Sequence, residues 1–471
     1  MNYKILIAKG KSRNRSLDLL KQTKRLMEKE IIKNLIDLLK HRVDEWEIFY
    51  SSQDGISIEA KDNAVESMKA SCSKGIGIRI LKDKKLGFSF SSDLSNKALS
   101  QTIDNALTAG SAVTSDKFYS FPASKDIVPK DLGLYDQSIK DTHEKEKIKK
   151  AFLLEDAARS FDKRITKVRN AIYSESTFTS SILNSKGINL IDSKTFISAS
   201  IMTIAEQNND AQMGWEMGTS HFAKDIDVKK IGEDAAKRAM EMLGAREIKS
   251  IKCPVMLENT VSVEFLETIA PSFLADNLHK GKSMLKDKKG KNIFSDCLTI
   301  IDNGLLQGGW ASSLFDSEGA KKKKTSLIKN GVIENYLYDT YWANREGIKS
   351  TGNSSRSNFK SVPAVSASNL YIENGTASFD DMMKEIDKGI LITGLLAVHT
   401  VNTISGDFSL GATGFYIENG KVSYPVRGVA IAGNLMDLFS RVSRVGSDAR
   451  FYGNVGAPSL LLNEMDVSGS G

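Results

Sequence analysis

Apolar residues recur at helical spacing in the middle of the chain, within residues 253–282. A recurrence every third or fourth residue places side chains on one face of a helix, and that face should pack against a core. The side chains in this stripe are Val261, Phe265, Leu266, Ile269, Ala270 and Phe273. A short apolar run before them, Pro254 to Leu257, predicts a strand, and Pro271 should kink or stop the helix.

The chain before this stretch alternates between helical and strand-like patterns. An amphipathic helix is predicted for residues 16–41, with an apolar side made of Leu19, Leu20, Leu26, Met27, Ile31, Ile32, Leu35 and Leu38. Strands are predicted at 45–51, 55–61, 64–71, 75–81 and 86–91, with a charged hairpin turn at 82–85. A helix over 93–112 follows, so the pattern indicates helices on one face of a mostly antiparallel sheet.

Residues 113–140 have the composition of a connector, and a second group of elements follows it. Asp141 and Glu144 have the spacing of a capping box, which predicts a helix from there to about Phe161. Strands are predicted at 166–178, 181–190 and 196–206, with a turn at 184–187. A helix over 228–243 should end at Gly244, and the polar linker after it marks a domain boundary.

The second half is dominated by short strands with glycine turns. Strands are predicted at 298–302, 326–329, 332–338, 367–373, 414–418 and 421–425. The last two flank Asn419-Gly420, a strong signal for a two-residue hairpin. Helices are predicted after residue 282 only near 338–346, 379–386 and 433–442, so this half should be mostly β, with a curved sheet or barrel-like body.

The fold class predicted for the whole chain is α+β. An N-terminal α/β-sandwich-like domain should be followed by the mostly β C-terminal domain. We expect a basic extension at 1–14, an N-terminal module at 15–120, a middle α+β module at 121–248 that packs with the first, and the C-terminal domain at 253–471.

Composition sets limits on the class of protein. The 471 residues are 41% hydrophobic and 26% charged, as in ordinary globular proteins. No apolar run is long enough to span a membrane, and the N-terminal sequence lacks a secretory cleavage site. The three cysteines, Cys72, Cys253 and Cys297, are far apart, so we expect no disulfide framework and a cytoplasmic location. Cys253 and Cys297 lie in strand-like runs and should be small core residues.

The net charge of +7 is concentrated in residues 1–40. A basic arm can contact nucleic acid. Aromatic residues do not alternate with the basic ones there, however, so a solvated helix face is the preferred interpretation and nucleic-acid binding is not expected. The lysine run Lys321 to Lys324 should likewise be a solvated loop.

Motif searches in the residues themselves find no catalytic cluster. HExxH, GxSxG and Walker sequences are absent, and the five histidines are isolated from one another. Each histidine is therefore expected to be a surface or hydrogen-bonded residue. Gly75-Ile-Gly77 lacks the third glycine and following helix of a phosphate loop, and should permit close strand packing. On residue chemistry alone, the chain would be a binding or assembly protein.

Longer stretches change this interpretation. FDSEGAKKKKTSLIKNGVIENYLYDTYWANREGIKSTGN (315–353), GDFSLGATGFYIENGKVSYPVRGVAIAGNLMDLF (406–439) and the Pro458-Ser-Leu-Leu-Leu ending resemble the TldD/PmbA family of metalloproteases. SKGIGIRIL, GFSFSSDLS and SESTFTSSILNSKG in the first half agree, so the resemblance covers about 45–471. An older label for the family is modulator of DNA gyrase.

The resemblance implies one of two kinds of chain. The TldD kind holds zinc with an HExxxH motif on a helix and a cysteine near the C-terminus, and the PmbA kind, also called TldE, lacks these ligands. When Pro254-Val255 and Lys280-Gly281 are set on the family's landmarks, the motif positions fall at Glu267, Thr268 and Ser272. The sequence has no histidine between His221 and His279 and no cysteine after Cys297. The chain therefore resembles the PmbA/TldE kind.

The resemblance implies a role in proteolysis of peptides or small proteins. The chain would be a non-catalytic subunit in a heterodimer with a TldD-type protease, with zinc only in that partner and no metal or cofactor of its own. Without such a chain, a homodimer would form. One alternative is an active metallopeptidase with a rearranged site that uses Glu264, Glu267, His279 or His399. Another is a nucleic-acid-associated regulator, prompted by the basic first 40 residues and the gyrase label.

Overall fold

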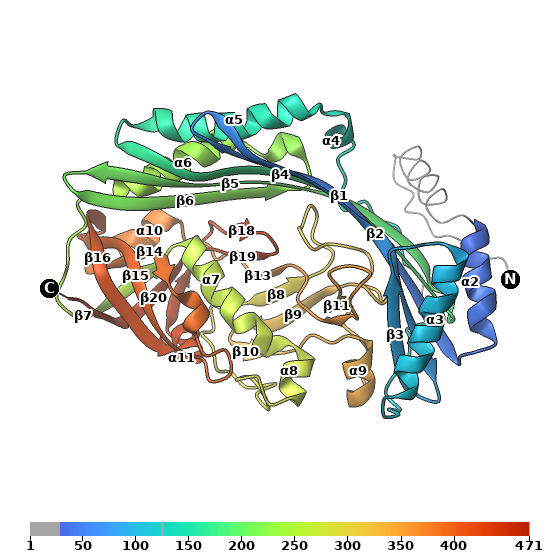
Figure 1. Ribbon diagram of the computed structural model, residues 1–471. Helices are drawn as coiled ribbons and strands as arrows, with labels where there is room; N and C mark the ends of the chain where they lie inside the picture. Colours follow the sequence, from blue (N-terminus) through green and yellow to red (C-terminus); the bar gives the residue numbers. More distant parts are fainter. Residues whose placement is uncertain (1–28, 124–126, 471) are drawn as a thin grey trace.

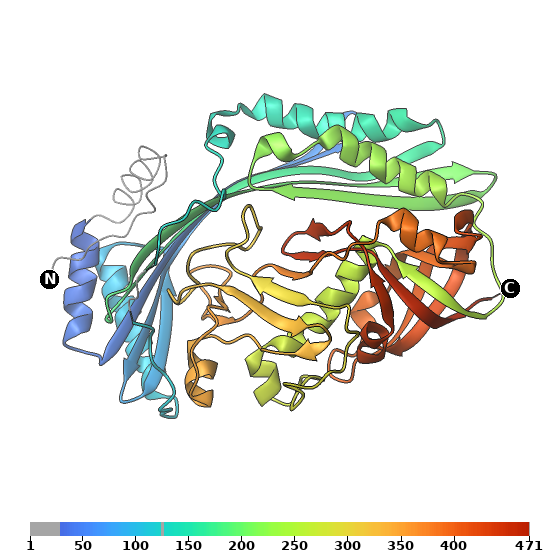
Figure 2. The same ribbon diagram turned by 180° about the vertical axis from the view of Figure 1, so that it is seen from behind.

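A long, bent sheet arches over a C-terminal body in the computed structural model, which describes residues 29–123 and 127–470 (Figure 1). Within these residues the strands form three six-stranded sheets and one two-stranded sheet. The helices α2, α3, α5 and α6 lie on the outer side of the arch, and the C-terminal body fills its inner side (Figure 2). The architecture is therefore α+β, as predicted.

The arch is one antiparallel sheet with the strand order β3-β2-β1-β4-β5-β6. Its strands are β1 (Glu45–Lys61), β2 (Ala64–Lys82), β3 (Lys85–Ser91), β4 (Ile165–Asn184), β5 (Asn189–Gln207) and β6 (Asp210–Ser220). The strands predicted at 45–51 and 55–61 form one long strand, because Ser52 to Asp54 continue the pairing with both neighbours. The strands at 64–71 and 75–81 merge in the same way, and β6 was not predicted.

The outer face of the arch carries two separate helix layers. The helices are α2 (Lys29–Lys40), α3 (Asn96–Ser111), α4 (Ser138–Asp141), α5 (Glu144–Phe161) and α6 (Val228–Glu241). At one end α2 and α3 pack on Ile48 and Tyr50 of β1, and at the other end α5 and α6 pack on Ile58 and Tyr173. Between these two cores the same face carries polar side chains such as Asp54, since strand residues two apart share a face.

Some local predictions for the first half were wrong. Leu38 is exposed, and Leu35, Ile36 and Leu39 form the buried side of α2. The predicted extension at 1–14 and residues 16–28 of the predicted helix lie outside the described residues. Asp141 does not cap α5; it ends α4, and the N-cap of α5 is His143, which makes no side-chain capping bond. The extended backbone at Thr142 separates the two helices.

The C-terminal body contains a closed barrel, which confirms the predicted barrel-like fold. Five strands pair in the order β16-β15-β14-β7-β20, and β20 pairs back to β16 to close the ring. The barrel strands, with β17 attached to β20, are β7 (Ile251–Leu257), β14 (Lys388–Leu396), β15 (Asp407–Glu418), β16 (Lys421–Asn434), β20 (Leu460–Ser468) and β17 (Val442–Val445). The predicted Asn419-Gly420 hairpin joins β15 and β16, with both residues at positive φ.

The third six-stranded sheet lies between the barrel and the end of the arch that contains β2 and β3 (Figure 1). Its strands, in spatial order, are β10 (Val332–Ile333), β9 (Lys324–Lys329), β8 (Ile300–Asn303), β13 (Leu370–Ile372), β19 (Val455–Ala457) and β18 (Arg450–Tyr452). The two-stranded sheet joins β11 (Ser354–Ser355) to β12 (Ala364–Val365). The three helices predicted in this half are α9 (Thr340–Glu346), α10 (Phe379–Lys384) and α11 (Leu435–Ser440).

The helix predicted from the central apolar stripe is α7 (Asn259–Ile269). The stripe is buried apart from the half-buried Ala270, and it packs into the largest core of the protein. At Pro271 the chain tightens into the 3₁₀-helix η2 (Ala270–Phe273), because proline cannot continue the α-helical hydrogen bonds. The short helix α8 (Ala275–His279) follows.

Three predictions for the second half were wrong. The strand at 332–338 is only the two-residue β10. Cys297 is exposed in a turn before β8, whereas Cys253 is a buried residue of β7 as predicted. The lysine run at 321–324 is not a solvated loop: Lys324 begins β9, and Lys322 turns inward against the arch. In the part of the chain that the structure describes, no helix is long and apolar enough to cross a membrane.

Candidate functional site

The resemblance sets the zinc motif on the last turn of α7 and on η2, and the three side chains there have unlike surroundings. Glu267 is exposed. Thr268 donates its hydroxyl to the Glu264 carbonyl oxygen at 2.8 Å, so this group is already bonded within the helix. Ser272 is fully buried, and its hydroxyl has no hydrogen-bond partner among the described residues.

These side chains do not fit a zinc ion. Zinc in proteins takes imidazole, thiolate or carboxylate ligands in tetrahedral geometry. Of the three positions only Glu267 offers such a group, and Ser272 is closed off by packing. Within residues 29–123 and 127–470, no group of three or more histidine, cysteine, aspartate or glutamate side chains lies close enough together to hold a metal ion.

Glu264 and Glu267 form an acidic pair on α7. Burial, together with the charge of Glu267, raises the pKa of Glu264 to about 7. Partial desolvation of the carboxyl group also raises the pKa of Glu267, although the side chain as a whole is exposed. One carboxyl oxygen of Glu264 is buried and has no partner in the described structure. A carboxyl group with a pKa near neutrality can exchange a proton at neutral pH.

Each histidine of the rearranged-site alternative has surroundings of its own. His279 on α8 pairs through Nε2 with Glu346 at 2.8 Å and stacks on Trp342. His399 lies in the 3₁₀-helix η3 (Val398–Thr400) on the surface. His221 is buried between the carbonyl oxygens of Thr195 and Gly309, so it is a hydrogen-bonded core histidine, as expected for an isolated histidine.

A buried charge network fastens the arch to the C-terminal body. Glu47 of β1 receives two hydrogen bonds from Arg79 of β2 and a third from Arg356, at 2.7 Å. Arg79 also donates to Glu318 at 3.1 Å. Burial would raise the pKa of Glu47, but the positive charges of Arg356 and Arg79 outweigh it and lower that pKa. The resulting carboxylate holds two arginines from distant parts of the chain.

The predicted close packing at Gly75 and Gly77 belongs to the same contact. A Cβ atom on Gly75 would lie 2.3 Å from the ring of Phe359, and one on Gly77 would lie 2.5 Å from the Phe359 carbonyl oxygen. Phe359 also donates its backbone N–H to the hydroxyl of Ser51 at 3.0 Å. Glycine is required here because the C-terminal body presses directly on the strands of the arch.

A cavity of about 360 Å³ lies beside this network, between the inner face of β1, β4 and β5 and the C-terminal body. Aromatic residues form much of its wall, namely Phe49, Phe178, Phe196, Trp310 and Phe315. Its charged residues are Asp192, Lys194, Asp316, Lys322 and Arg356. Burial, with the charge of Lys194, lowers the pKa of Lys322 to about 8.

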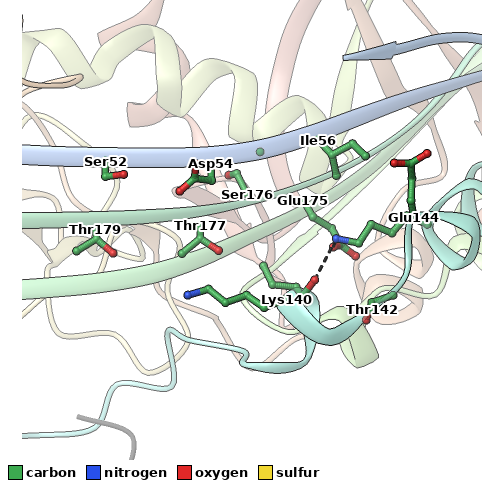
Figure 3. A pocket seen from close by; sticks show the side chains of 13 residues that line it. Ser52, Asp54, Ile56, Lys140, Thr142, Glu144, Glu175, Ser176, Thr177 and Thr179 are labelled. Carbon is green, nitrogen blue, oxygen red and sulfur yellow. Dashed lines mark hydrogen bonds and ion pairs between the residues drawn. The ribbon is translucent and has the colours of Figure 1, made fainter. Parts of the chain in front are cut away.

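A second hollow, of about 420 Å³, opens on the outer face of the arch between the two helix layers. Figure 3 shows Asp54 of β1 and Thr177 of β4 on one side and Lys140 on the other. Its buried carboxylate, Glu175, is already paired with Lys147 at 2.6 Å and receives the Tyr173 hydroxyl. The buried carboxylate of this hollow is thus paired with a lysine from its own lining, whereas the inner cavity has a buried guanidinium with unpartnered nitrogens, so the inner cavity is the better candidate for ligand binding.

The segments that build the arched sheet and the closed barrel match family models of metallopeptidases. Three family models match the chain: PmbA/TldA metallopeptidase domain 1 at residues 46–110, the central domain at 137–243 and the C-terminal domain at 250–469. Together they cover most of its length. The chain belongs to the PmbA/TldD family of metallopeptidases.

Individual relatives agree with this assignment. The chain is 29% identical over 452 residues to metalloprotease PmbA of Escherichia coli O157:H7, which covers 95% of this chain and 97% of that protein. A Thermotoga maritima protein that carries the name of a DNA gyrase modulator has a similar structure, with a TM-score of 0.87, 27% identity, and coverage of 93% of this chain and 99% of that one. TldE of Thermococcus kodakarensis shares the fold, with a TM-score of 0.85, 23% identity, and coverage of 93% and 100%.

Sequence reasoning missed the residues of the network and the inner cavity. No sequence motif or pattern marked Arg356 or Lys322 as a functional residue. Lys322 was predicted to lie in a solvated loop. The only hint was that both lie in or next to the 315–353 stretch that carries the family resemblance. That stretch and the residues just after it contribute side chains that contact the arch, among them Glu318 and Arg356.

Proposed function

We propose that this chain is the PmbA/TldE kind of subunit, which supports zinc-dependent peptide cleavage by a TldD-type partner and does not itself hold the zinc. The single observation that supports this most directly is the set of side chains on α7 and η2. An exposed carboxylate, a hydroxyl bonded to the backbone and a fully buried hydroxyl stand at the positions to which the family resemblance assigns the zinc motif. Zinc belongs, in this proposal, to the partner alone.

The partner would supply the zinc and the base, and this chain would frame the substrate and stabilise the complex. Where no TldD-type chain is present, two copies of this chain would pair with each other. A cytoplasmic location is part of the same proposal, because the three cysteines are all free.

Co-purification and cleavage assays test the proposal. The chain alone should contain no stoichiometric zinc and cleave no peptide, whereas a mixture with a TldD-type chain from the same genome should elute as one complex and cleave. A mixture in which the TldD-type chain has lost the glutamate of its motif is the matched control and should be inactive. Stoichiometric zinc in the isolated chain, with peptidase activity that a chelator abolishes, would contradict the proposal.

The acidic pair on α7 favours a second candidate function, a peptidase with a rearranged site. Glu264 has the raised pKa that a general base requires at neutral pH. The candidate residues remain Glu264, Glu267, His279 and His399. Alanine substitution at each position should abolish cleavage by the isolated chain if this function is real, and four unchanged variants would exclude it.

A further inference from the structure

The inner cavity has buried hydrogen-bond donors left over on its basic side chains. Arg356 is buried. Its Nη2 donates hydrogen bonds to Glu47 and to the Ser317 carbonyl oxygen. Its Nε and Nη1 have no partner within the described parts of the chain. Lys322 donates to the Ala311 carbonyl oxygen at 3.0 Å and to the Ser368 hydroxyl at 2.9 Å, which leaves one of its three N–H groups.

Three of the four carboxylate oxygens of the cavity already have partners: both oxygens of Asp316 and Oδ2 of Asp192. Asp316 accepts three backbone N–H groups, from Glu318, Ala320 and Ser354, at 2.9 to 3.0 Å. Asp192 pairs with Lys194 at 3.2 Å and accepts the Ser313 hydroxyl at 2.8 Å. A ligand that enters this space therefore meets donors that need an acceptor, beside three basic side chains and two acidic ones. Unpartnered donors beside an excess of positive charge favour an anionic group as the ligand.

The remaining wall decides what kind of anion fits. Aromatic rings surround the donors, and Trp310 packs edge-on against Phe196 at 4.7 Å between ring centroids. A free inorganic anion would leave these rings in contact with water. A C-terminal amino acid of a peptide carries a carboxylate and an apolar side chain on one carbon atom. Within a cavity of about 360 Å³, the carboxylate of such a residue would contact the basic side chains and its apolar side chain would contact the aromatic rings. Seven serines in the lining offer hydrogen-bond partners for the peptide backbone.

We infer that this cavity is a binding site for the free C-terminal end of a peptide, with the carboxylate at Arg356 and Lys322 and an apolar side chain against Phe178, Phe196 and Trp310. The choice of a peptide rests on the proposed function. In this inference the subunit binds the peptide substrate by its C-terminus.

Direct binding to the isolated full-length chain tests the site. The probes are acetyl-Ala-Ala-Phe with a free carboxylate, the same peptide as its C-terminal amide, and acetyl-Ala-Glu-Phe amide, which carries its carboxylate on a side chain. By titration calorimetry the free acid should bind at least about tenfold more tightly than either amide, because a charge-assisted hydrogen bond to a buried donor contributes about that much.

Variants separate the cavity from general charge. Lys322→Met keeps the length of the side chain, removes its charge and should lower affinity for the free acid to that for the amide. Lys321→Met is the matched control, because Lys321 is the exposed neighbour in the same run. This variant should still bind the free acid more tightly than the amides, by the same factor as the parent. Arg356→Gln gives an independent second variant, and thermal unfolding of each protein shows that it is folded before binding is compared.

Three results would overturn the inference. They are equal affinity for the free acid and the amides, no binding of the free acid at millimolar concentration, and a preference that survives in both Lys322→Met and Arg356→Gln. The titration uses no zinc and no protease. Its failure therefore leaves the subunit role to be decided by the cleavage assay, and failure of the cleavage assay leaves the carboxylate site standing.

Discussion

Nη2 of Arg79 on β2 lies 3.1 Å from Oε1 of Glu318, although 239 residues separate them in the sequence. The same guanidinium also holds Glu47, which in turn holds Arg356. All four side chains are buried. Breaking a buried network by removing one member is expensive because it leaves an uncompensated charge in a medium of low dielectric constant.

Glu47→Gln should therefore destabilise the protein strongly. The change leaves Arg79 and Arg356 with Glu318 as the remaining carboxylate of the network, and the expected loss is about 3–5 kcal/mol. The denaturation midpoint in urea measures it. Glu66→Gln is the control, since Glu66 on the neighbouring strand β2 makes only an exposed pair with Lys61 at 3.5 Å and should change stability by less than about 0.5 kcal/mol.

The same variant has a defined pH dependence. The pKa of Glu47 in the folded protein lies below its ordinary value of 4.5, so its stabilising contribution is complete above that pH. As the pH falls through the lowered pKa the contribution is lost. The difference in stability between the parent and Glu47→Gln should thus be large at pH 7 and shrink below about pH 4.5. A difference that grows on acidification would contradict this.

Glu264 should show the opposite dependence. Its pKa in the folded protein is raised to about 7, so between pH 4.5 and 7 the folded state binds more protons than the unfolded state. Stability from this group consequently falls as the pH rises through that window. The melting temperature of Glu264→Gln should equal that of the parent at pH 5 and be higher than that of the parent at pH 8, because the parent then carries a partly buried charge. Glu418→Gln, an exposed carboxylate on β15, should show no such crossover.

Ser272 and Ser283 offer a matched pair beside α7. Ser272→Ala should be neutral or stabilising by up to about 1 kcal/mol, because the buried hydroxyl has no described partner to lose. Ser283 donates to the Ser272 carbonyl oxygen at 2.6 Å and accepts from the Leu285 N–H at 3.1 Å. Ser283→Ala should therefore cost about 1–3 kcal/mol in denaturant titrations. The reverse order would show that the Ser272 hydroxyl is hydrogen-bonded.

Gly75→Ala tests the contact between the arch and the C-terminal body. The new Cβ would meet the Phe359 ring at 2.3 Å and the Ser91 carbonyl oxygen at 2.6 Å, and overpacking of this kind costs about 1–3 kcal/mol. Gly394→Ala is a control in the barrel, where the only close atom is the movable hydroxyl of Thr413 at 2.9 Å. Its effect on the unfolding midpoint should be clearly smaller.

The sequence predicted those parts of the fold that depend on short-range patterns. The stripe from Val261 to Phe273 set the buried face of α7 correctly, and Asn419-Gly420 marked a real hairpin. Asp141 failed because a capping box fixes only spacing, and the extended backbone at Thr142 takes its side chain away from α5. β6 carries several polar and glycine residues, and no alternating pattern marked it.

The candidate sites were predictable to different degrees. Glu267, Thr268 and Ser272 were identified only through the family's landmarks, and no local pattern distinguishes them. Lys322 and Arg356 face inward where segments far apart in the sequence meet: Arg356 contacts Glu47 across 309 residues. A run of four lysines carries no sign of which one turns inward. Only the path of the chain, which brings β9 under the arch, decides it.

The pairing of β1 with β4 has a consequence for how such proteins are inherited and engineered. The first two family segments, 46–110 and 137–243, are recognised as separate stretches of sequence, yet their strands share one set of hydrogen bonds. Neither stretch could be moved into another gene and keep its sheet, since each would expose a bare strand edge to aggregation. The segments that homology recognises separately must be inherited, expressed and transplanted together.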